Sequence, residues 1–162
     1  MSRERIPLDW INEDKKSNNE LSTDPQKDSP IRRRKIRSDK SRDIKFPVSK
    51  SEQIRLKTVC KQADIFYKKI YGYDKKLTQT HFNTLLLNYA LKQLDEVDWH
   101  KVYLDSKMYM HTKPTETEYT AIGGPYGLST MKGISDRKVV YFLVITALEN
   151  LERQGDYNSV LL

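Results

Sequence analysis

The chain has 162 residues, a formal net charge of +7 and 37% hydrophobic residues, so it is long enough for one folded domain with a tail. The positive charge favours a polyanionic partner such as nucleic acid. A single cysteine, Cys60, excludes an internal disulfide, and no apolar run is long enough for a membrane span or a signal peptide, so we expect a cytoplasmic protein with no membrane partner.

Residues 1–42 are rich in Ser, Asn, Asp, Lys and Arg and contain few large apolar side chains, so they are expected to be disordered when free. Ile6, Leu8, Trp10 and Ile11 form a small apolar island, which either binds a partner protein or is an idle terminus. Between residues 31 and 45, eight Lys and Arg stand against two Asp and Glu. This block predicts phosphate contacts that raise affinity without selecting a base sequence, and its alternative is a solvated linker. The expected DNA-contacting residues of the arm are Arg32, Arg33, Arg34, Lys35, Arg37, Lys40 and Arg42.

A short strand follows the basic arm, with Ile44, Phe46 and Val48 on one face and Lys45 on the other. The sequence from Ser49 to Glu52 fits a capping box, which predicts a helix over residues 50–71 that ends at Gly72. Thr78 is then placed to cap a second helix. The apolar face of that helix consists of Phe82, Leu85, Leu86, Tyr89, Ala90 and Leu94.

This order of one strand and two helices resembles the ribbon-helix-helix family of DNA-binding proteins, and the resemblance covers residues 43–96. It implies a homodimer in which the strands of two chains pair into an antiparallel ribbon that enters the major groove, while the second helix supplies much of the dimer core. Carried over to this chain, it places Lys45, with Asp43 and Pro47, towards the base edges. It also implies that the backbone N–H groups of Thr78, Gln79 and Thr80 bind a phosphate.

From about Val97 the sequence predicts a separate α/β region of unknown role. Short strands are expected at residues 102–104, 107–112 and 118–122, and the last two would form a small hairpin with a turn at residues 113–115. Ser135 is placed to cap a helix over residues 136–154 that ends at Gly155. The predicted fold class is therefore α+β, with a disordered arm (1–42), a ribbon-helix-helix-like dimerising domain (43–96) and a hairpin-plus-helix region (97–162).

The loop Gly123–Gly127 contains neither GxxxxGK[ST] nor GxGxxG, so a plain connection is expected there. Residues 128–138 could instead form a helix-turn-helix that presents Arg137 and Lys138. The histidines of the chain show no spacing typical of a metal site or a catalytic triad. No enzyme activity, catalytic residue, cofactor or metal is therefore predicted.

Together these patterns predict a homodimeric, sequence-specific double-stranded DNA-binding protein. The resemblance extends to partition and replication-associated proteins of plasmids in Gram-positive bacteria and to transcriptional repressors, and it implies that the tail contacts a ParA-like ATPase or a replication protein. The alternative is a protein-interaction module or inhibitor that binds an acidic protein or a nucleoprotein partner.

Overall fold

Strand β1 (Ile44–Pro47) is the first element of the computed structural model, which describes residues 42–162. Ile44 and Phe46 are buried and Lys45 is exposed, so the predicted alternation is confirmed. Val48, the next inward residue, is also buried. Pro47 is buried as well, and the expectation that it faces base edges is wrong because it offers no free surface.

The predicted bounds of the first helix and the predicted start of the second are confirmed, whereas Leu94, expected on the apolar face of the second helix, lies beyond its end and is exposed. Helix α1 (Lys50–Tyr71) begins with the capping box of Ser49 and Glu52 and ends at Gly72, whose φ of 104° favours glycine. Helix α2 (Gln79–Lys92) begins at Thr78, whose hydroxyl accepts the His81 N–H. The remaining elements are η1 (Leu94–Glu96), β2 (Tyr109–Thr112), α3 (Glu116–Gly123), α4 (Leu128–Lys132), α5 (Asp136–Gln154) and α6 (Asn158–Leu161).

The two strands pair with each other in an antiparallel two-stranded sheet, with Ile44 opposite Thr112 and Phe46 opposite Met110. Hydrogen bonds from the Arg42 N–H to Pro114 and from the Val48 N–H to Met108 extend this register beyond both strand ends. The position that the family resemblance assigns to a strand of a second chain is therefore occupied by β2 of the same chain.

The described chain repeats the order strand, helical segment, central helix. The first copy is β1, α1 and α2, and the second is β2, the short helices α3 and α4, and α5. Both helical segments begin with a capping box, Ser49 with Glu52 and Thr115 with Glu118. The second copy has a shorter first helical segment, interrupted at Gly124.

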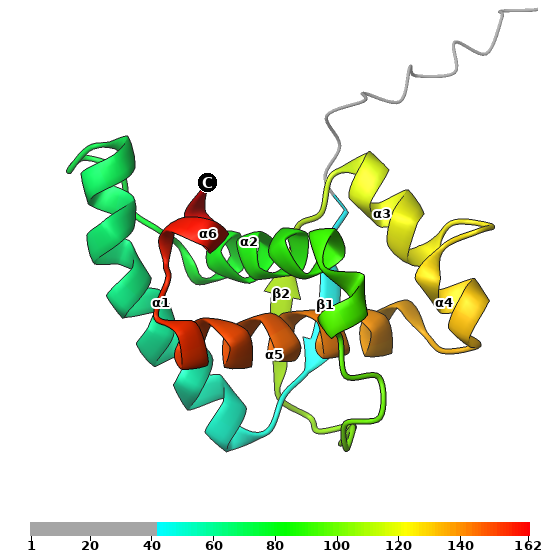
Figure 1. Ribbon diagram of the computed structural model, residues 1–162. Helices are drawn as coiled ribbons and strands as arrows, with labels where there is room; N and C mark the ends of the chain where they lie inside the picture. Colours follow the sequence, from blue (N-terminus) through cyan, green and yellow to red (C-terminus); the bar gives the residue numbers. More distant parts are fainter. Residues whose placement is uncertain (1–41) are drawn as a thin grey trace, which may run out of the picture. The chain divides into compact units, whose positions relative to one another are not determined.

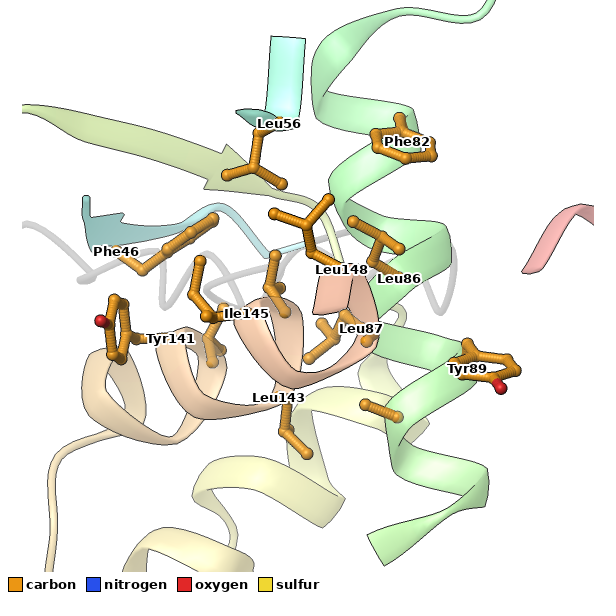
Figure 2. Packing of buried hydrophobic residues seen from close by; sticks show 14 of the residues in the cluster. Phe46, Leu56, Phe82, Leu86, Leu87, Tyr89, Tyr141, Leu143, Ile145 and Leu148 are labelled. Carbon is orange, nitrogen blue, oxygen red and sulfur yellow. The ribbon is translucent and has the colours of Figure 1, made fainter. Parts of the chain in front are cut away.

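The two copies interleave rather than stack as separate domains. Helices α2 and α5 pack against each other, α5 also packs on β1, and α2 packs on β2. Figure 1 shows α1 and the α3–α4 pair on opposite sides of the central α2 and α5. In Figure 2, Phe46 of β1 lies against Ile145 of α5, and Leu86 of α2 lies beside Leu148. The boundary predicted at residues 96 and 97 thus runs through one hydrophobic core.

The predicted hairpin in the C-terminal region is wrong. Residues 107–112 do contain a strand, β2, but residues 118–122 belong to helix α3 and residues 102–104 form no strand. Tyr119, Thr120 and Ile122 have high strand propensity, but the capping box of Thr115 and Glu118 satisfies the first helical N–H groups. The helix 136–154, capped by Ser135 and ended by Gly155, is confirmed.

Candidate nucleic-acid interface

The outward side of the β1–β2 sheet is the clearest candidate site. We call it the ribbon face, and it consists of Asp43, Lys45, Tyr109, His111 and Lys113. Lys45 lies opposite His111, and the continued register places Asp43 opposite Lys113. Lys45, Asp43, Tyr109 and Lys113 are exposed and His111 is half-buried, so this side presents donors, acceptors and an aromatic ring to solvent.

The corner between β1 and α1 is fixed by polar contacts. The Glu52 carboxylate accepts the Ser49 N–H at 2.7 Å, and its other oxygen accepts the Tyr141 hydroxyl at 2.7 Å. Burial raises the pKa of Tyr141, and the hydrogen bond to Glu52 raises it further, so this hydroxyl stays a donor at neutral pH. One carboxylate therefore ties the end of β1 to α5 of the other copy.

Helix α2 closes the outer edge of β2. The Asn83 amide is fully buried, donates to the His111 carbonyl at 3.0 Å and accepts from the Gln79 amide at 2.9 Å. The Thr84 hydroxyl accepts the Lys113 N–H at 2.9 Å. Because these side chains use backbone groups that would otherwise pair with a further strand, they restrict the ribbon on this side to two strands.

Charged side chains flank the ribbon face. The Asp43 carboxylate contacts His111 Nδ1 at 3.0 Å, and the Arg137 guanidinium lies 5.8 Å from the centre of the Tyr109 ring. Arg42 pairs with Glu116 at 3.1 Å and lies 4.2 Å from the ring centre of Tyr119. The pair uses Nε and Nη2 of Arg42 and leaves the side chain half-exposed, so the guanidinium keeps Nη1 donors for a phosphate.

The starts of helices α2 and α5 differ in charge. In α2 the side chains of Thr78 and Gln79 are used within the fold, since Gln79 bonds to Asn83. The Thr80 carbonyl accepts the Thr84 hydroxyl. First-turn N–H groups of a helix have no partner inside it, which leaves the α2 start able to donate through its backbone. The first turn of α5 carries the exposed cation Arg137 next to the half-buried Asp136.

A second cationic surface lies on α1. Lys50, Lys57, Lys61 and Lys69 recur at helical spacings with Ile54 and Ile65 on the exposed side of this helix, and we call this set the lysine face. Residues 50–76 carry eight Lys and Arg against three Asp and Glu, whereas residues 42–162 carry eighteen against fourteen. The positive charge of the described residues is thus concentrated on α1 and the turn after it.

Six of the predicted DNA-contacting residues lie outside the described residues, and these are Arg32, Arg33, Arg34, Lys35, Arg37 and Lys40. The structure brings Lys45 together with Tyr109, His111 and Lys113, none of which was predicted as a site residue. The repeated capping box, Ser-Lys-Ser-Glu at residues 49–52 and Thr-Glu-Thr-Glu at residues 115–118, follows a strand in both places and is the sequence signal that could have revealed the pairing of the two strands.

Within residues 42–162, no group of three or more His, Cys, Asp or Glu side chains could hold a metal ion. None of the helices in this part of the chain is long and apolar enough to cross a membrane. The sequence matches no protein-family model and no curated protein, and the fold matches no solved structure.

Proposed function

We propose that the protein binds double-stranded DNA in a sequence-specific manner and that the ribbon face reads the bases. The observation that carries the proposal is a two-stranded antiparallel ribbon whose outward side is polar and exposed. The major groove is wide enough for such a ribbon, and a lysine can donate to guanine O6 and N7. Lys45, in the central row of the ribbon, is the residue placed best for a base contact.

The order of elements supports the ribbon-helix-helix resemblance. The resemblance implies a paired ribbon and a second helix that supplies much of the core, and the pairing of β1 with β2 and the packing of α2 against α5 support it within one chain. Homodimerisation, which the resemblance also implies, is not needed to complete the ribbon.

The cellular role follows only from the resemblance. We infer a cytoplasmic protein that acts in plasmid partition, plasmid replication or transcriptional repression. The arginine-rich part of residues 31–45 would add phosphate contacts. Residues 1–30 would contact a ParA-like ATPase or a replication protein, and a deletion of residues 1–30 that leaves all such interactions unchanged would contradict this role.

The test is selection of bound sequences from a random duplex pool with the full-length protein, followed by binding measurements with Lys45→Ala. Loss of a good base contact costs about 1–3 kcal/mol for the selected site and little for unrelated DNA. Arg33→Ala should weaken binding to all sequences alike and flatten the salt dependence. Sequence-blind binding by the wild-type protein would contradict the proposal.

The lysine face favours a second candidate function, binding of an acidic protein or nucleoprotein. Ile54 is 56% exposed and Ile65 is 58% exposed, and both lie among exposed lysines. Apolar side chains inside a cationic surface suit an acidic partner that also supplies apolar contacts. Lys57→Glu combined with Lys61→Glu should abolish capture of such a partner and leave the base preference unchanged.

A further inference from the structure

The two strands of the ribbon are different sequences, which distinguishes this chain from a homodimeric ribbon. In a homodimer both strands carry the same side chains, so the bound site mirrors the protein's two-fold symmetry and is palindromic. Here the chain supplies both strands itself. The binding surface is therefore symmetric only if the two different strands happen to carry equivalent side chains.

The outward rows of the ribbon face are chemically unequal. Consider a two-fold axis that passes between Lys45 and His111, the pair at the centre of the ribbon face. A rotation about this axis exchanges the two strands, so it puts Lys45 in the place of His111 and Asp43 in the place of Tyr109. Lysine only donates hydrogen bonds, whereas a neutral histidine both donates and accepts. An aspartate accepts, whereas a tyrosine offers a ring and a hydroxyl. The two halves of the surface thus present different patterns to a groove.

The helix starts beside the ribbon face also differ from each other in chemistry. Helix α5 has the exposed Arg137 in its first turn, next to Tyr109, whereas the first turn of α2 consists of Gln79, Thr80 and His81 and contains no Lys or Arg. A phosphate beside α5 would meet the Arg137 guanidinium next to the Asp136 carboxylate, whereas one beside α2 would meet backbone N–H groups and no Lys or Arg side chain.

The ribbon also leaves no pairing position for the β1 strand of a second chain on its inner edge, because β2 occupies that edge of β1. On the outer edge of β2, Asn83 and Thr84 already bond to the backbone of His111 and Lys113. Within the described residues, β1 and β2 therefore form a two-stranded reading element from one chain.

We infer that one chain reads one duplex site and that this site is not a palindrome. The inference rests on the proposed function, since it concerns how the ribbon face reads DNA. Lys45 and His111 then specify bases on different sides of the centre of the site, and the strand register fixes which side each one reads.

The experiment uses the full-length protein and a duplex that carries one site selected from a random pool. We expect one chain per duplex by native mass spectrometry and a consensus without dyad symmetry. Replacing one half of the site by an inverted copy of the other half should weaken binding by about tenfold or more, the scale of a mismatched base pair. Lys45→Ala and His111→Ala should relax preference at different base positions, and the control Lys61→Ala at neither.

The outcomes separate the inference from the proposed function. A palindromic consensus occupied by two chains would overturn the inference and leave sequence-specific DNA binding intact. Failure of selection to enrich any sequence would overturn both. If His111→Ala unfolds the protein, His111→Gln keeps a side chain that donates and accepts, and it should alter preference on the His111 side alone.

Discussion

Phe46 has no exposed surface and lies between β1 and α5, so it links the two copies of the strand–helix–helix order. Its ring is among the largest fully buried side chains of the described residues. Truncation would remove the apolar contacts and leave a cavity at the point where the copies meet, because neighbouring side chains relax only in part.

We expect Phe46→Ala to lower the free energy of unfolding by about 3–5 kcal/mol, measured by urea denaturation. Tyr126, which is 93% exposed, provides the matched aromatic control, and Tyr126→Ala should change stability by less than about 0.5 kcal/mol. Equal effects of the two substitutions would contradict the packing described for Phe46.

Cys60 lies on the buried side of α1, and burial raises the pKa of its thiol to about 11. The neighbouring Asp64 carboxylate raises it further. Since the thiolate is the reactive form, we expect iodoacetamide at pH 8 to leave the folded protein unmodified and to alkylate it quickly in denaturant. Rapid alkylation without denaturant would show that α1 opens readily.

At the scale of elements, Asp64 joins α1 to the turn before α2. Its carboxylate accepts the Leu77 N–H at 2.8 Å and pairs with Lys68 at 2.7 Å. The hydrogen bond to Lys68, followed by that from Leu77, lowers the pKa of Asp64 in the folded protein. Its contribution to stability is therefore full above the pKa of an unfolded aspartate and is lost as the pH falls through the lower pKa of the folded state.

We expect Asp64→Ala to lower the free energy of unfolding at pH 7 by about 1 kcal/mol, the usual net contribution of one hydrogen bond. The difference from the wild type should vanish in acid, once the wild-type carboxylate is protonated. Asp74→Ala, at an exposed position in the same turn, is the control. If the free energies of unfolding of Asp64→Ala and the wild type still differ at low pH, the effect comes from packing and not from charge.

At the scale of the whole molecule, the crossed packing of α5 on β1 and of α2 on β2 makes the two copies depend on each other. Neither copy can cover its own strand, so each alone would expose an apolar sheet face. We expect fragments 1–100 and 101–162 to lack fixed tertiary structure when separate, and near-UV circular dichroism to return on mixing. A fragment 1–100 that unfolds cooperatively by itself would contradict this dependence.

Local signals allowed most elements to be predicted, because capping and side-chain alternation act between residues close in sequence. The strand at Phe46, the capping box at Ser49 and Glu52, and the glycine ends at Gly72 and Gly155 are examples. The same type of signal occurs at Thr115 and Glu118, but the strand-forming residues after it favour a hairpin in the sequence pattern where the structure has a helix.

The positions of the main helices, the apolar face of β1 and the basic block before the strand all follow from local sequence patterns. The pairing of β1 with β2, the packing of α5 on β1 and the position of Lys45 opposite His111 are visible only in three dimensions. The physical reason is that strand pairing joins residues far apart in the chain. Their match depends on which apolar faces can be buried together, and a periodic pattern within one segment does not encode that choice.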